Sequence, residues 1–412
     1  MRAITCVLPL LAVLAGCNAD PTGAGSSGKE AEVSSSANPE QTDEDALAAR
    51  DPAPGEQAQV DIPDPEKRPT MQMQVVLDRL GFTPGVVDGR MGMSTRNAIE
   101  GFQEANDIEV TGEADEETKK ALEKWNNIPA TRVVTIPASF ASEPFRNIPD
   151  SAADKAEMER LGYTSLDEKL AERFHTTVDV LKRLNPGGRP AGMEQAGASP
   201  SEPARLGLAS PSASPSATPS ADAGGDAERA QTSMFAAGQQ IRVPNVGNDR
   251  IEDGAVENAQ WRSTLATLGI GTNQPEAARV VVSKSGGTLK VYDDADKLVA
   301  MYTATMGSEH DPLPLGEWKV VGVAHNPPFQ YDPDLFWDVP DSEEDRMLPP
   351  GPNGPVGVVW IDLSKEHYGI HGTPEPQTIG RAQSHGCVRL TNWDAARLAE
   401  MVSPGTQVLF EA

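Results

Sequence analysis

A short stretch near the C-terminus carries residue types that could perform nucleophilic chemistry. Cys387 follows Gly386, and His371 stands 16 positions before it. A free cysteine has a pKa of about 8.5, so its thiol needs a base that removes the proton before it attacks a carbonyl. The imidazole of His371 can act as that base, with a backbone carbonyl fixing its ring. The pattern predicts acyl transfer through Cys387.

The glycine before the cysteine supports this hypothesis, and two other interpretations stay open. Gly386 leaves room for backbone N–H groups to point at a developing oxyanion, and each such donor lowers a barrier by roughly 3 kcal/mol. A lone cysteine in a β domain is more often a small buried apolar residue. His371, His385 and Cys387 could instead bind zinc, although no fourth ligand stands at a typical spacing.

The same stretch resembles the L,D-transpeptidase family, also called the YkuD or ErfK/YbiS/YcfS/YnhG family. The likeness covers residues 278–412 and includes His371-Gly372, Gly380 and Ser384-His385-Gly386-Cys387-Val388-Arg389-Leu390. Two upstream segments match the family's strand entry and the aromatic-bearing loop beside its active site: Pro314-Leu315-Gly316-Glu317-Trp318 and Asn326-Pro327-Pro328-Phe329.

This resemblance implies a reaction and a set of roles. Cys387 is the nucleophile, His371 is its base, and Gly372 holds the base through its backbone carbonyl. The family cleaves a tetrapeptide stem of peptidoglycan after the third residue, releases D-alanine and passes the acyl group to an amine of another stem. The product is a 3–3 cross-link, and no metal or organic cofactor is needed. The resemblance also implies that the motif loop and the oxyanion region are formed by Ser384, His385, Gly386 and Arg389.

Three functions fit these residues: a transpeptidase, an L,D-carboxypeptidase that uses water as the acceptor, and a non-catalytic wall-binding scaffold. A papain-like or NlpC-type hydrolase is disfavoured because it places its cysteine before its histidine. We expect a substrate-facing loop at Asn326, Phe329 and Trp337. The segment 330–355 is long, acidic and rich in proline, unlike the family pattern, which leaves the pocket shape and the acceptor open.

The elements that must position these residues are mainly strands. From Arg279 onward, short β-branched and aromatic runs are separated by Gly, Asp and Pro, which predicts a mainly antiparallel β domain over residues 278–412. His371 ends one of these runs. Thr391 and Asp394 have the form of a capping box and predict a helix that continues through Met401.

A separate small helical module is predicted at residues 70–126. Apolar residues at helical spacing alternate with glycine-rich turns. The segment resembles the three-helix peptidoglycan-binding domain, a likeness that implies glycan or peptide binding without chemistry of its own. The matching residues are Leu77, Leu80, Gly81, Val87-Asp88-Gly89, Gly92, Thr95, Ala98, Phe102-Gln103, Thr111-Gly112, Thr118 and Leu122.

Residues 153–245 resemble a LysM module that is interrupted by a low-complexity insertion. Residues 165–187 look like its helical half, and Gly238–Pro244 looks like its closing strand. The Ser-, Ala- and Pro-rich insertion at 187–231 is tolerable because the cost of closing a loop grows only logarithmically with its length. A generic helical pair is the alternative.

Residues 1–17 resemble a lipoprotein signal peptide. Arg2 precedes an apolar run that is too short to span a bilayer, and Leu14-Ala15-Gly16-Cys17 resembles a lipobox. Lipidation of Cys17 would anchor the exported protein to a membrane through several acyl chains. Asn18, in place of an aspartate, favours the outer membrane. An ordinary secretory signal that happens to contain a cysteine is the alternative.

Composition agrees with a multidomain chain joined by disordered linkers. The 412 residues include 35 Pro and 37 Gly, and residues 18–69 form a predicted disordered tether. A net charge of −26 argues against nucleic acid as a partner, because such binding relies on Lys and Arg. Cys6 lies in the removed segment and Cys17 is lipidated, so Cys387 has no disulfide partner.

Overall fold

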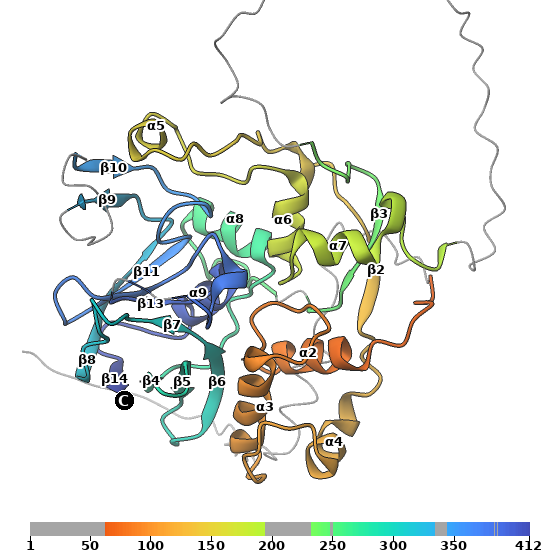
Figure 1. The fold of residues 1–412 in the computed structure, drawn as a ribbon, viewed down its shortest axis with the longest axis horizontal. Coiled ribbons are helices and arrows are strands. Elements are labelled where there is room, and N and C mark those ends of the chain that lie inside the picture. The colour runs from red at the N-terminus through yellow and green to blue at the C-terminus, as the bar shows by residue number, and fades with distance from the viewer. Residues whose placement is uncertain (1–61, 194–231, 248–249, 334–343, 383, 385) are drawn as a thin grey trace, which may run out of the picture. The chain divides into compact units, whose positions relative to one another are not determined.

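The structure is a computed structural model that describes residues 62–193, 232–247, 250–333, 344–382, 384 and 386–412 (Figure 1). All of them belong to one compact unit, residues 46–412. The predicted signal peptide, Cys17, most of the tether and most of the insertion lie outside the described residues. No helix among the described residues has the length and apolarity needed to cross a bilayer.

The first module is the predicted three-helix domain. Pro69 opens its first helix, a position where the missing N–H costs nothing. Phe102 lies at its centre and meets the rings of Phe82 and Trp125 edge to face. Gly92 is the N-cap of the second helix. The elements are α2 (Pro69–Arg79), β1 (Phe82–Thr83), α3 (Met93–Ala105), α4 (Glu116–Leu122) and the 3-10 turn Glu123–Trp125.

The second module has two capped helices beside a two-stranded antiparallel sheet. Ser165 and Thr177 cap the helices α6 and α7 through their side-chain oxygens. The predicted closing strand is present as β3, and its partner β2 lies before residue 153, where the sequence analysis began the module. The elements are β2 (Thr131–Thr135), α5 (Ala152–Ala156), α6 (Leu166–Arg173), α7 (Val178–Leu184) and β3 (Gln240–Pro244).

The C-terminal part is a mainly antiparallel β domain. Its sheet has the order β1-β6-β5-β4-β14-β8-β11-β12-β13-β7, and β9 pairs with β10 in a separate hairpin. The strands are β4 (Arg279–Ser283), β5 (Thr288–Tyr292), β6 (Leu298–Thr303), β7 (Thr305–Met306), β8 (Gly316–His325), β9 (Phe329–Tyr331), β10 (Arg346–Leu348), β11 (Val359–Leu363), β12 (Gly369–His371), β13 (Val388–Arg389) and β14 (Gln407–Glu411).

Two helices pack on the core of this domain. Helix α9 (Asn392–Ala399) begins after its predicted cap, Thr391, whose hydroxyl accepts from the Asp394 N–H. Helix α8 (Ala259–Leu268) was not anticipated; it starts at the Asn258 cap and ends at a left-handed glycine. Buried Trp261 and Trp393 from these helices join the valines and isoleucines of the strands in one core. The domain therefore extends to the N-terminal side of residue 278.

The modules touch one another directly. Strand β1 of the first module pairs in parallel with β6 of the β domain, with Phe82 opposite Met301. A Cβ on Gly101 would lie 2.8 Å from the Met301 sulfur, so the absence of a side chain lets α3 approach this strand. His175 of the second module is buried and stacks on Trp393 of the β domain. Within the described residues, the modules share their cores.

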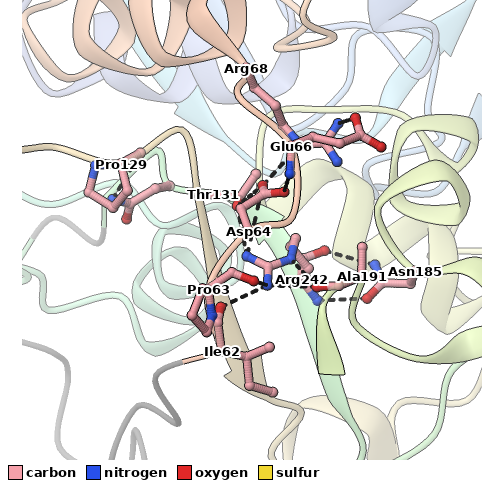
Figure 2. A network of polar contacts seen from close by, with 11 residues as sticks. Ile62, Pro63, Asp64, Glu66, Arg68, Pro129, Thr131, Asn185, Ala191 and Arg242 are labelled. Atoms are coloured by element: carbon pink, nitrogen blue, oxygen red, sulfur yellow. Dashed lines mark hydrogen bonds and ion pairs between the residues drawn. The ribbon is translucent and has the colours of Figure 1, made fainter. Parts of the chain in front are cut away.

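Arg242 on β3 anchors the segment that precedes α2. Figure 2 shows its guanidinium donating to the carbonyls of Ile62, Pro63 and Ala191 and to the Thr131 hydroxyl, at distances of 2.8–3.0 Å. This side chain is almost wholly buried, and its donors therefore need these acceptors. Residues 62–69 were predicted to belong to the tether, but this network fixes their start against the second module.

Candidate active site

The two central candidate residues lie on neighbouring strands. Strands β12 and β13 run in parallel, with Ile370 opposite Val388 and His371 opposite Arg389. Ile370 and Val388 are buried in the core. Because side chains alternate along a strand, Cys387, the residue before Val388, points to the same face as His371. The alternation thus places a thiol and an imidazole on the same face of the sheet, opposite the core.

His371 is held as a neutral base. Its ring is buried, lies stacked on Trp360, and its Nδ1–H donates to the Gly372 carbonyl at 2.7 Å. This hydrogen bond assigns the proton to Nδ1 and leaves the Nε2 lone pair available to take a proton. Burial lowers the pKa of His371 to about 4, with a smaller contribution from the positive charge of Arg389. The imidazole is therefore uncharged at neutral pH.

The thiol of Cys387 is partly exposed and carries its proton at rest. Burial raises the pKa of Cys387, while the backbone of Gly369 and the charge of Arg389 act in the opposite direction. The sulfur also lies 3.9 Å from the His367 carbonyl. A raised thiol pKa beside a lowered imidazole pKa means a neutral pair, so proton removal accompanies attack on the substrate. Arg389 is placed to stabilise the thiolate as it forms.

The motif loop before Cys387 is tied down at several points. The Ser384 hydroxyl donates to the Cys387 carbonyl at 2.7 Å, and the Ser384 N–H donates to the Gly307 carbonyl. Gly386 has a φ of +97°, and a Cβ there would lie 2.8 Å from the Tyr368 ring. The motif therefore requires glycine at this position for conformation and for space. His385 lies outside the described residues.

A buried side chain outside the predicted site, that of Asn392, packs against Gly372. The Asn392 side chain is wholly buried and lies against Gly372, where a Cβ would come within 2.3 Å of its Oδ1. Its Nδ2 donates to the Glu172 carboxylate at 2.7 Å and to the Pro352 carbonyl at 3.1 Å. Asn392 thus lies directly behind the residue that orients His371.

Glu172 brings the second module into this arrangement. It is buried on α6 and accepts hydrogen bonds from the Tyr163 hydroxyl and from Asn392, both at 2.7 Å. Burial raises the pKa of Glu172 to about 7. A charged residue on a helix gives no sequence signal for such burial. The sequence does place a polar residue, Asn392, directly after Thr391, the cap of α9.

The predicted substrate loop is corrected in one position. Asn326 is buried, and its Oδ1 accepts from the Thr264 hydroxyl of α8, so this side chain holds the loop against a helix. Phe329 is half-buried at the start of β9. Trp337 lies outside the described residues. No group of three His, Cys, Asp or Glu side chains in the described residues is arranged to hold a metal ion.

The sequence of this region matches a known family. Residues 277–409 match the family described as "L,D-transpeptidase catalytic domain", and residues 69–122 match the one described as "Putative peptidoglycan binding domain". The "Putative L,D-transpeptidase YkuD" of Bacillus licheniformis is 37% identical over 130 residues, which make up 32% of this chain and 63% of that protein. The "Putative L,D-transpeptidase YqjB" of Bacillus subtilis is 29% identical over 135 residues, or 32% of this chain and 69% of that protein.

A solved structure of an L,D-transpeptidase from Mycobacterium smegmatis is 24% identical, with a TM-score of 0.27, and the match covers 32% of this chain and 58% of that one. The match to the first relative likewise spans less than two thirds of its length. The first match contains strands β4 to β13 and helix α9, with Cys387 and His371, and the second contains α2, β1, α3 and α4. The chain therefore carries an L,D-transpeptidase catalytic domain behind an N-terminal peptidoglycan-binding domain.

Proposed function

We propose that this protein is a peptidoglycan L,D-transpeptidase in which Cys387 is the nucleophile and His371 is the base. The observation that supports this most directly is the hydrogen bond from His371 Nδ1 to the Gly372 carbonyl. It leaves Nε2 unprotonated on the face of the sheet to which Cys387 points. A thiol beside a neutral, fixed imidazole is the arrangement that cysteine acyl transfer requires.

The first half-reaction forms a thioester. The Cys387 sulfur attacks the carbonyl of the third residue of a tetrapeptide stem while His371 Nε2 takes the thiol proton. The bond from that carbonyl carbon to the D-alanine nitrogen then breaks, and the imidazolium returns the proton to the leaving amine. The positive charge of Arg389 stabilises the negative charge that develops on the sulfur as it is deprotonated.

The second half-reaction regenerates the thiol. An amine of another stem attacks the thioester carbonyl, His371 takes the amine proton, and the carbon–sulfur bond breaks. The departing sulfur recovers the proton, and the new amide is the 3–3 cross-link. Water in place of the amine would yield a tripeptide stem instead, which is the carboxypeptidase outcome of the test below.

Purified full-length protein incubated with disaccharide-tetrapeptides tests the proposal. We expect cross-linked dimers by mass spectrometry, and none from Cys387→Ala. His371→Gln should lower the rate by roughly 10²–10⁴-fold. Arg262→Gln, which removes an exposed side chain on α8, should leave it unchanged. Tripeptides alone would indicate a carboxypeptidase. Absence of product, together with a Cys387 that a carbapenem does not acylate, would indicate a scaffold.

The pH profile of acylation tests the protonation states. Since the pKa of His371 is lowered to about 4 and that of Cys387 is raised, both groups stay neutral between about pH 5 and 8. The carbapenem acylation rate should therefore be flat over this range and fall below about pH 5 as the imidazole becomes protonated. An inflection near pH 6.5 would contradict a neutral resting pair.

We also propose that the protein is exported and anchored by lipid on Cys17, with the outer membrane as the favoured site. The Leu14-Ala15-Gly16-Cys17 sequence and the following Asn18 support this. Mass spectrometry of the mature N-terminus provides the test. An unmodified N-terminus at a residue other than Cys17 would contradict it.

A further inference from the structure

All three modules line one cavity of about 330 Å³. The first module contributes the loop that runs from Pro84 to Thr95. The second module contributes the start of α7, and the catalytic domain contributes the turn at Pro376–Arg381. This volume is at the lower end of the range for sites that hold small ligands. The cavity is therefore large enough for the end of a short peptide.

Each module places one arginine at this cavity: Arg90, Arg183 and Arg381, all exposed. Asp88 and Asp179 also line it. Asp88 Oδ1 already accepts from the Gln74 side chain and from the Arg90 N–H, while Arg183 donates to the Asp88 carbonyl. Among the described residues, no carboxylate forms an ion pair with any of the three guanidinium groups. Three guanidinium groups thus stand against two carboxylates, which gives the cavity a local excess of positive charge in a chain with a net charge of −26.

The catalytic turn at the cavity is continuous with the strand that carries the catalytic motif. The Gly380 N–H donates to the Thr305 hydroxyl at 2.7 Å, and Thr305 on β7 is the register partner of Arg389 on β13. On its other side the turn meets the first module, because a Cβ on Gly380 would lie 2.5 Å from the Met93 methyl group. One turn thus borders both the arginine cavity and the strand next to Cys387.

We propose that this junction cavity binds the carboxylate end of a second stem peptide while another stem reacts at Cys387. The proposal rests on the proposed function for the identity of the ligand. Arginine is suited to carboxylates because its planar guanidinium can donate two parallel hydrogen bonds to them. A stem bound there contacts all three modules at once. The helical modules then select the strand of cell wall presented to the catalytic domain.

Calorimetric titration of the full-length Cys387→Ala variant with soluble disaccharide-tetrapeptide tests this without any turnover. We expect binding that weakens by roughly tenfold for each arginine removed, in Arg381→Gln and in the double variant Arg90→Gln/Arg183→Gln. Arg262→Gln removes an exposed arginine elsewhere and should bind as the parent does. A stem with amidated carboxyl groups should bind at least tenfold more weakly than the free stem to the parent, and the two stems should bind equally to the triple variant Arg90→Gln/Arg183→Gln/Arg381→Gln.

The outcomes separate this inference from the proposed function. Unchanged affinity in the arginine variants, or equal binding of the amidated stem, would overturn the cavity assignment even if cross-links form. Arginine-dependent binding by a protein that forms no thioester at Cys387 would support the cavity and contradict the transpeptidase. Thermal unfolding of each variant verifies that the exposed substitutions leave the fold intact.

Discussion

Two of the contacts that join the helical modules to the β domain differ in kind. At one, Phe82 and α3 cover Met301 on β6 through apolar packing and two paired strand residues. At the other, Glu172 and Tyr163 reach buried Asn392 through hydrogen bonds. The first contact involves no residue of the motif. The second ends at Gly372, whose carbonyl accepts the hydrogen bond from the His371 imidazole.

The difference suggests that the apolar contact attaches the first module to the β domain, whereas the polar contact fixes the position of Gly372. Apolar packing stabilises in proportion to buried area and tolerates small shifts. A buried polar network is sensitive to geometry, because each unsatisfied donor or acceptor costs free energy. We therefore expect damage at Met301 to lower stability and damage at Asn392 to lower the rate of acylation as well.

Asn392→Ala should have the largest effect on chemistry. It leaves the Glu172 carboxylate without one buried donor and removes the side chain packed behind Gly372. We expect the acylation rate of Cys387 by a carbapenem to fall by about 100-fold, since small misplacements of catalytic groups cost about that much. Asn258→Ala removes a helix cap far from the motif in sequence and should cost about 1 kcal/mol of stability without changing the rate.

Met301→Ala should have a large effect on stability and little on chemistry. This side chain is 1% exposed, and its loss leaves a cavity between β6 and α3. The free energy of unfolding in denaturant should fall by about 2–4 kcal/mol. The acylation rate per folded molecule should stay within twofold of the parent. A large drop in that rate would show that the apolar contact also aligns the site.

Glu172→Gln should change how stability depends on pH. The pKa of Glu172 is raised to about 7 in the folded protein, against about 4.5 for an exposed carboxyl, so the folded state binds the proton more tightly. Its contribution is fully present below about pH 4.5 and is lost as pH rises through 7. The parent should therefore lose up to about 3 kcal/mol relative to Glu172→Gln between these values. Parallel unfolding curves across this range would contradict the assignment.

Glu104→Gln should have the smallest effect. At the rim of the apolar contact, Glu104 accepts from Lys290 and from the Tyr292 hydroxyl, and these groups are partly exposed. Partly exposed ion pairs contribute at most about 1 kcal/mol. Unfolding measured at low and high salt should show a small loss that salt reduces further. A cost above about 2 kcal/mol would mean that attachment depends on charge rather than on packing.

The catalytic strands were predictable because the relevant signals are local. The alternation of side chains around Val388 distinguishes the face that packs on the core from the face that carries Cys387. Thr391 marks the start of α9, because its hydroxyl accepts from the N–H three residues later. The family resemblance rested on the same short segments. The βααβ module was harder to predict because β2 finds its partner more than a hundred residues later, across a low-complexity segment.

The contacts between modules were not predictable for a similar reason. Strand β1 has two residues, too few for a periodic pattern, and it exists because β6 offers an edge. Glu172 occupies a position on α6 that reads as a solvated charge until Tyr163 and Asn392 are seen beside it. The sequence pattern also predicted that Asn326 faces a ligand. It gives no sign of the hydrogen bond that the Thr264 hydroxyl donates to this side chain.

The Arg242 network has a mechanical consequence. Arg242 donates hydrogen bonds to the backbone carbonyls of Ile62 and Pro63, ahead of α2, and to that of Ala191. Tension along the polypeptide ahead of Ile62 is therefore borne first by strand β3, before it reaches the helix α2. Strand β3 is paired with β2, so this load falls on the second module. The same module contributes Glu172, whose hydrogen bond to Asn392 ends beside the residue that holds His371.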